Sequence, residues 1–145
     1  MESFKSTATT LAEHSNPLTQ RIYWEDTDAG GVVYYANYLR FFERARTEWL
    51  RALGVEQASL QAQADCIFLV AEVHLKYLAP ANLDDLLSVT VTVVEHGRAS
   101  LQLEQQAWRG QTLLAHARVR VGCVRATTLK PCRIPEPVIA ALLQH

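Results

Sequence analysis

The chain has 145 residues, of which 49% are hydrophobic, so it is long enough to bury the core of one domain. Its 14 basic and 15 acidic residues give a net charge of −1, which argues against nucleic acid as a partner. The opening residues lack the apolar stretch of a signal peptide, and no run reaches the roughly 18 apolar residues of a membrane-spanning helix. We therefore expect a cytoplasmic protein.

The chain is expected to begin with a flexible tail. Residues 1–18 are polar and rich in serine and threonine, and such termini are poorly ordered unless something holds them. No internal repeat and no second linker follow in the sequence, so residues 19–145 are predicted to form a single domain. Within it, residues 19–25 (TQRIYWE) predict a short first strand.

The next stretch, residues 37–53, predicts a long helix. Asn37 is a suitable N-cap, because its side chain can accept a hydrogen bond from a free amide of the first turn, and Gly54 is well placed as the C-terminal stop. Apolar residues cover about half of the helix circumference, which indicates a helix embedded in a curved sheet. These residues are Tyr38, Leu39, Phe41, Phe42, Ala45, Trp49, Leu50, Ala52 and Leu53.

Arg46 lies in the middle of this apolar face. A desolvated guanidinium needs a partner, so we expect Arg46 to meet a carboxylate or several backbone carbonyls inside the fold. Glu25 and Asp26 are the preferred partners. The alternative is that the long side chain reaches past the end of the helix to water.

Stretches of alternating apolar residues follow the helix and predict four further strands. They span residues 67–77, 87–93, 101–107 and 113–123. Short glycine turns separate the last three, which therefore predict an antiparallel meander. Residues 136–145 (EPVIAALLQH) predict a short closing helix. One long helix and about five strands predict an α+β domain in which an antiparallel sheet wraps around the central helix.

Two motifs carry a resemblance to a known family. The first is RIYWEDTDAGGVVYYANYLRFFERARTEWLRALG (residues 21–54), and the second is KYLAPANLDDLL (residues 76–87). Both resemble the 4-hydroxybenzoyl-CoA thioesterase family of hotdog-fold proteins, and within it the bacterial acyl-CoA thioesterases associated with the Tol-Pal system (YbgC-like). The resemblance covers roughly residues 19–135. It implies a hotdog fold, with a sheet of about five strands wrapped around one long helix.

The resemblance implies that this chain hydrolyses the thioester bond of acyl-CoA to a free acid and CoA. The catalytic carboxylate of the family matches Asp28, which acts either as a nucleophile on the thioester carbonyl or as a base that activates water. A backbone amide at the start of the helix matches Tyr35 and polarises the carbonyl oxygen. This role agrees with the chemistry of helix starts, whose unpaired amides and positive dipole end stabilise an oxyanion. YbgC-like proteins often carry histidine at the position of Tyr35, but the backbone amide is unaffected by that difference.

The acidic cluster of Glu25, Asp26 and Asp28 also has a purely structural interpretation. Asp28 precedes a Gly-Gly pair and suits an Asx turn, in which its carboxylate accepts a backbone amide. Glu25 and Asp26 suit a structural role in holding the loop. The ring of Tyr35 suits either packing or a role for its hydroxyl.

The cysteines and histidines indicate neither a metal site nor a cofactor. Cys66, Cys123 and Cys132 show no CxxC spacing, and the 5 histidines are scattered without ligand spacing, so we expect no metal. Cys123 falls on the apolar face of a predicted strand and is expected to be an inert core thiol. Neither Cys66 nor Cys132 has a histidine near it in sequence, which argues against a Cys-His nucleophile. No cofactor is expected, since coenzyme A belongs to the substrate.

The expected partners follow from the resemblance. Coenzyme A carries phosphates, for which Lys76 and Arg98 are candidate contacts, although ordinary solvated charges are an equally good interpretation. The family joins two sheets into a homodimer with active sites at the interface and often pairs dimers into a homotetramer, and we expect the same here. Acyl carrier protein is a further candidate partner.

Two other functions fit the predicted fold. One is a subunit that binds acyl-CoA or acyl carrier protein without hydrolysing it. The other is a dehydratase or hydratase, which would need a histidine acid or base near the central helix, and no histidine lies between residues 15 and 73. The sequence leaves the length and the aromatic or aliphatic nature of the acyl group open.

Overall fold

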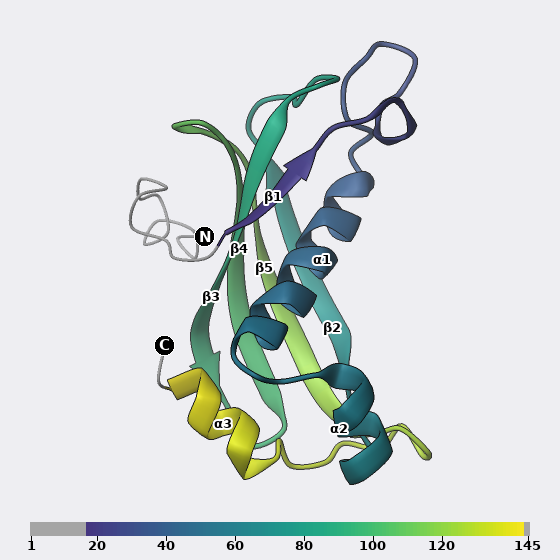
Figure 1. Ribbon diagram of the computed structural model, residues 1–145, viewed down its shortest axis with the longest axis vertical. Helices are drawn as coiled ribbons and strands as arrows, with labels where there is room; N and C mark the ends of the chain where they lie inside the picture. The colour runs from purple at the N-terminus through teal and green to yellow at the C-terminus, as the bar shows by residue number, and fades with distance from the viewer. Residues whose placement is uncertain (1–16, 144–145) are drawn as a thin grey trace.

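A curled antiparallel sheet, with one long helix lying along its inner face, dominates the structure (Figure 1). The computed structural model describes residues 17–143. Its sheet has five strands in the order β1-β3-β4-β5-β2, and all neighbouring strands are antiparallel. The strands are β1 (Leu18–Arg21), β2 (Cys66–Tyr77), β3 (Leu86–His96), β4 (Ser100–Arg109) and β5 (Thr112–Arg125).

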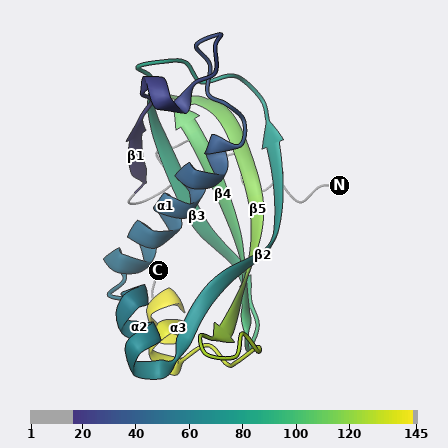
Figure 2. The ribbon, with the colours of Figure 1, turned by 90° about the vertical axis from the view of Figure 1, so that its right-hand side faces the viewer.

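The helices of the described part differ in length and position. They are α1 (Asn37–Ala52), α2 (Gln57–Ala64), α3 (Glu136–Leu143) and a short 3-10 helix (Trp24–Asp26). Figure 2 shows the sheet curving around α1, while α2 and α3 are both at the other end of the molecule from the loop that precedes α1. No helix within residues 17–143 is long and apolar enough to cross a membrane.

The core lies between α1 and the inner face of the sheet. Phe41 and Phe42, near the middle of α1, are buried together with Leu87 from β3, Leu103 from β4 and Val119 from β5. Burying side chains of this size stabilises a fold by roughly 1.5–3 kcal/mol each, so this contact holds α1 in the curve of the sheet. The arrangement fixes the position of the helix start, where the candidate site lies.

The predicted architecture is confirmed, with two differences in detail. The first strand is shorter than predicted, because the chain leaves β1 after Arg21 and enters the 3-10 helix at Trp24. Helix α2 was not predicted. Its residues favour helix, but none of them is buried, so its sequence shows no apolar stripe. The predicted tail falls on residues that lie outside the described part, apart from Pro17 and Leu18. Leu18 is the first residue of β1 and pairs with Val89 of β3.

Arg46 is partly buried, as its place on the apolar face of α1 predicted, but its expected partner was wrong. Its Nη1 donates to Oε1 of Gln105 over 2.9 Å, so the acceptor is a neutral side-chain amide and not a carboxylate or a backbone carbonyl. Gln105 is fully buried on β4 and is itself held by a 3.0 Å bond from its Nε2 to the carbonyl of Phe42. Glu25 and Asp26 lie before the start of α1, more than two helical turns from Arg46 along the chain.

Candidate active site

Asp26 organises the loop that connects β1 to α1. Its buried carboxylate accepts the backbone amide of Tyr23 over 2.9 Å, which closes the 3-10 helix. Its backbone carbonyl accepts two donors, the amide of Tyr34 at 3.1 Å and the side-chain Nδ2 of Asn37 at 2.8 Å. The structural role expected for Asp26 is therefore observed, whereas Glu25 lies exposed on the surface.

The N-cap of α1 differs from the prediction. Ala36 occupies the N-cap position and Asn37 is the first helical residue. Asn37 acts as a donor to Asp26 and not as an acceptor for a first-turn amide. Its side chain thus ties the helix start back to the loop. The amides of Asn37, Tyr38 and Leu39 in the first turn already donate to backbone carbonyls, so a free amide has to be sought before the N-cap.

Asp28 lies in a tight turn within this loop and is exposed. Its amide donates to the carbonyl of Val32 over 2.8 Å, and its carbonyl accepts the amide of Gly31 over 3.1 Å. Its Oδ1 accepts the amide of Gly30 over 2.9 Å, so the Asx turn is present. Gly31 has a φ of +82°, a left-handed conformation that favours glycine. Within residues 17–143 no donor reaches Oδ2, so one carboxylate oxygen of Asp28 keeps its lone pairs available.

Tyr35 stands directly before the N-cap of α1. No acceptor among residues 17–143 takes its amide, which is what a donor to a substrate oxygen requires. Its carbonyl accepts the hydroxyl of Tyr77 over 3.0 Å, which joins the helix start to the end of β2. The rings of Tyr34 and Tyr77 lie 4.8 and 6.0 Å from the ring of Tyr35, so the side chain belongs to an exposed aromatic cluster.

The two motifs of the sequence form one structural unit. The amide of Val33 donates to the carbonyl of Ala81 over 2.8 Å, and the amide of Leu83 donates to the carbonyl of Gly31 over 3.1 Å. The segment before β3 therefore supports the Gly-Gly turn from beside it. The two motifs, which are distant in the sequence, therefore lie side by side at the candidate site.

The segment before β3 is held by a salt bridge between Arg109 and Asp85, which was not predicted from the sequence. Nη1 of Arg109 donates to Oδ2 of Asp85 over 2.8 Å and to the carbonyl of Pro80 over 3.1 Å. Desolvation raises the pKa of Asp85, but the amide of Asn82 and the guanidinium of Arg109 outweigh it and hold the pKa below its ordinary value. The carboxylate is therefore ionised and fixes the turn before β3.

An apolar cavity of about 210 Å³ lies between α1 and the edge strand β2. Its lining residues are Leu39, Phe42, Arg46, Val70, Val73 and Val119. Leu39, Val70 and Val73 are exposed in the single chain. The cavity is thus suited to an apolar group.

The comparisons with known proteins identify the family. A family model described as the thioesterase-like superfamily matches residues 22–142. The chain belongs to this superfamily. The resemblance inferred from the two motifs is thereby confirmed, and the curled sheet around α1 is the hotdog fold predicted for it.

This chain is similar to individual thioesterases over most of their length. It is 46% identical over 121 residues to the acyl-CoA thioesterase YbgC of Haemophilus influenzae, covering 83% of this chain and 89% of the relative. It is 42% identical over 125 residues to the acyl-CoA thioester hydrolase YbgC of Escherichia coli O157:H7, covering 86% and 92%. The crystal structure of a probable thioesterase from Bartonella henselae aligns with a TM-score of 0.79 at 32% identity, covering 83% and 98%.

The candidate phosphate contacts of this thioesterase-like chain lie in different places. Lys76 precedes Tyr77 at the end of β2 that meets the helix start. Arg98 lies in the turn that follows β3, whereas the segment that supports the Gly-Gly turn precedes β3. β3 has 11 residues, so these two turns are about 35 Å apart. Within one chain, Lys76 is therefore the better placed of the two to meet a ligand held at Asp28.

The three cysteines do not contribute a nucleophile to this site. Cys66, Cys123 and Cys132 are buried and free. Burial raises the pKa of the Cys66 and Cys123 thiols, and neighbouring thiols raise that of Cys123 further, so their thiolate forms are disfavoured. The fold nevertheless brings the three sulfurs together, which the sequence did not predict.

Proposed function

We propose that this protein is an acyl-CoA thioesterase that hydrolyses acyl-CoA to a free acid and coenzyme A. The observation that carries the proposal is the 42–46% identity to proteins named as acyl-CoA thioesterases over about nine-tenths of their length. The arrangement of the loop supports it, since a carboxylate with a free oxygen and an amide without an acceptor flank the same turn.

In the proposed reaction, the amide of Tyr35 donates to the thioester carbonyl oxygen. Negative charge develops on that oxygen as the carbonyl is attacked, and the positive end of the α1 dipole stabilises it further. Asp28 has two possible roles. As a base it takes a proton from the attacking water, and as a nucleophile it forms a mixed anhydride that water then hydrolyses. Either route consumes one water and releases the acid and the thiol.

We propose that the active unit is a dimer joined through the free edge of β2. β2 has 12 residues and pairs with β5 on one side only, so its outer edge is a template for another strand. The apolar side chains of Leu69, Val70 and Val73 along it are exposed in the single chain. A second sheet would cover the open side of the apolar cavity. Pairing of dimers into a tetramer is the alternative assembly.

The proposed cellular context rests on the sequence for the location and on the resemblance for the partners. We place the protein in the cytoplasm, associated with the Tol-Pal system, with acyl carrier protein as a further candidate partner. The reaction itself requires no metal or redox cofactor in this proposal. The runner-up function, binding of acyl-CoA without hydrolysis, has the same fold and the same pocket.

The decisive experiment measures thiol release from a panel of acyl-CoAs of graded length, including aromatic ones. A thioesterase releases free thiol from at least one of them, and the profile across the panel gives the acyl preference. The same panel is tested for binding by a direct method such as calorimetry. Binding without any thiol release would favour the non-hydrolytic subunit, and neither binding nor release would overturn both functions.

A further inference from the structure

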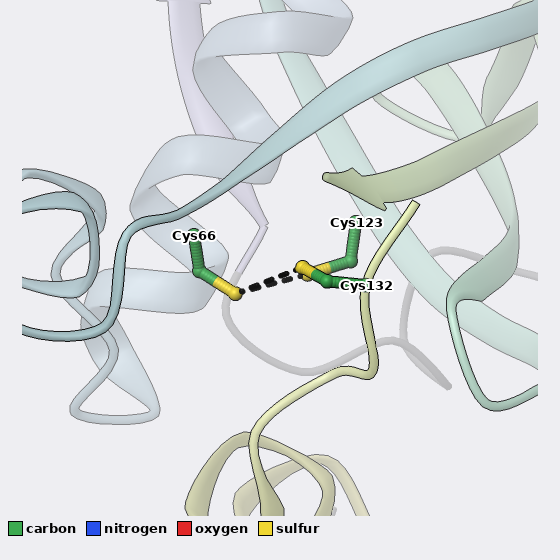
Figure 3. A group of neighbouring side chains, drawn as sticks. All are labelled: Cys66, Cys123 and Cys132. Carbon is green, nitrogen blue, oxygen red and sulfur yellow. Dashed lines mark hydrogen bonds between the residues drawn. The ribbon is translucent and has the colours of Figure 1, made fainter. Parts of the chain in front are cut away.

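Three cysteines from three segments of the chain, Cys66, Cys123 and Cys132, meet in one cluster (Figure 3). The sulfur atoms of Cys66 and Cys123 are 3.3 Å apart, those of Cys66 and Cys132 are 3.5 Å apart, and those of Cys123 and Cys132 are 3.6 Å apart. Their side chains are almost fully enclosed, with residue exposures of 2%, 1% and 9% in chain order. Three sulfurs so close in a buried place form a ready-made set of soft ligands.

The backbone brings the three thiols together from three segments. Cys66 is the first residue of β2, and Cys123 lies on β5 directly opposite Phe68 of β2. Cys132 lies in the segment that leads to α3, and its amide donates to the carbonyl of Cys123 over 2.9 Å. The strand register and this single bond therefore fix the mutual positions of the side chains. The cluster lies at the opposite end of β2 from Tyr77, so it is remote from the candidate active site.

We infer that Cys66, Cys123 and Cys132 form a binding site for one Zn²⁺ ion. The point equidistant from the three sulfurs lies about 2.0 Å from each, and an ion displaced from their plane by about 1.1 Å reaches the zinc–sulfur bond length of about 2.3 Å. This displacement gives a pyramid with one open position, as in a tetrahedral zinc site. Among residues 17–143 no histidine or carboxylate joins the three thiols, so water takes the fourth position.

A cavity beside the cluster supplies the path for the ion and its water. It has a volume of about 280 Å³ and is lined by Arg98, Ala99, Pro131, Cys132 and Arg133. Cys132, the least enclosed of the three cysteines, forms the contact between the cavity and the cluster. A plausible metal site needs such an entry path in addition to its ligands.

The charges favour a divalent ion. Binding releases three thiol protons, the zinc stays divalent, and three thiolates with one Zn²⁺ leave a single net negative charge. A monovalent ion such as Cu(I) would leave two negative charges, and an enclosed site disfavours uncompensated charge. Arg98 and Arg133 at the cavity offset the remaining charge. The ion would join β2, β5 and the segment before α3, so its role is to stabilise this end of the domain.

The test uses the full-length protein, reduced and stripped of metal with a chelator, and titrates it first with Co²⁺ and then with Zn²⁺. Cobalt in a sulfur-rich tetrahedral site gives sulfur-to-cobalt charge-transfer absorption and intense visible bands. We expect both signals to saturate at one equivalent of Co²⁺ and to vanish when one equivalent of Zn²⁺ displaces it. Zn²⁺ should also raise the melting temperature, because it binds the folded state.

The matched variant is Cys132→Ser, since Cys132 is the least enclosed ligand. We expect it to lose the charge-transfer band and to bind Zn²⁺ at least about 100-fold more weakly, while its metal-free melting temperature and its thiol release from acyl-CoA stay near those of the wild type. If Cys132→Ser does not fold, X-ray absorption at the zinc edge of the wild type counts the sulfur neighbours directly, with three expected. Wild-type protein that lacks cobalt–sulfur absorption, or a folded Cys132→Ser that binds Zn²⁺ as tightly as the wild type, would overturn the site.

Discussion

The side-chain amide of Asn37 donates to the backbone carbonyl of Asp26 over 2.8 Å, and this bond joins the first residue of α1 to the loop that carries Asp28. The carboxylate of Asp26 closes the other side of the same loop through the amide of Tyr23. Asp28 is therefore held between two fixed points, although it is itself exposed. The position of its carboxylate relative to the helix start depends on residues that do not touch a substrate.

Replacing Asn37 tests whether it acts as a donor or as a cap. Asn37→Ala removes the bond to Asp26, and we expect a loss of about 1 kcal/mol in the free energy of unfolding, or about 3 °C in melting temperature. Asn37→Asp is the informative comparison. An aspartate is as good a cap as asparagine, but it has no donor and it would face the carbonyl of Asp26. Melting curves should show Asn37→Asp to be no more stable than Asn37→Ala, and wild-type stability of Asn37→Asp would contradict the donor role.

Asp28 and Asp26 should respond differently to the same substitution. Asp28→Asn keeps the shape and the Asx turn but removes the reactive carboxylate, so we expect kcat to fall about 10²- to 10⁴-fold while acyl-CoA binding stays near the wild-type value or tightens. Asp26→Asn should affect the chemical step much less and lower the melting temperature instead, since Asp26 is buried and holds the loop. Thiol-release kinetics and melting curves separate the two. The assignment fails if Asp28→Asn turns over at the wild-type rate or if Asp26→Asn is the more damaging for kcat.

Local periodicity was sufficient to predict most of the fold. The apolar face of α1 and the alternation in β2 to β5 arise from burial on one side, which a sequence displays directly. Helix α2 escaped prediction because it buries no residue, and its helical state follows from backbone propensity alone. The sequence also predicts the Asx turn at Asp28, because its partner Gly30 is only two residues away.

Contacts between residues that are far apart in the chain could not be predicted from the sequence. Gln105, which accepts from Arg46, is 59 residues further along the chain, and its position under α1 depends on the register of β4. The sequence neighbours of Asn37 predict an N-cap, whereas its side chain donates to Asp26, which lies 11 residues earlier across the loop. Cys66 and Cys132 are 66 residues apart. The thiol cluster has no recognisable ligand spacing, because three separate segments supply its cysteines. Spacing in the sequence identifies sites whose residues share one turn or one helix face. The contacts above join residues of different segments, so spacing does not predict them.

The backbone amide of Tyr35, and not its side chain, should carry the oxyanion role. Tyr35→Ala keeps the amide, and we expect its kcat to stay within about tenfold of the wild type. Tyr35→Pro removes the donor, and losing one oxyanion donor typically costs about 10²- to 10³-fold in kcat. Circular dichroism and melting curves must show that both variants are folded. Equal losses of kcat in the two folded variants would assign the role to the side chain.

The final prediction concerns the free edge of β2. If two chains join there, the wild type should run as a dimer or larger on sizing, and its activity per chain should fall as the protein is diluted toward monomer. Val73→Asp places a charge on the exposed apolar edge and should shift the protein toward monomer. Val94 on β3 is exposed to a similar extent, so Val94→Asp is the matched control and should leave the assembly unchanged.

A dimer joined at the β2 edge would also close the apolar cavity beside α1. Its lining residues Val70 and Val73 lie on β2 and are exposed in the single chain, as is Leu39 of α1, so we expect a second sheet at β2 to complete the wall that an acyl group needs. Monomeric Val73→Asp should therefore lose activity most strongly with acyl-CoAs whose acyl group fills this cavity. A wild-type chain that is monomeric at assay concentration and fully active would contradict both the interface and the shared cavity.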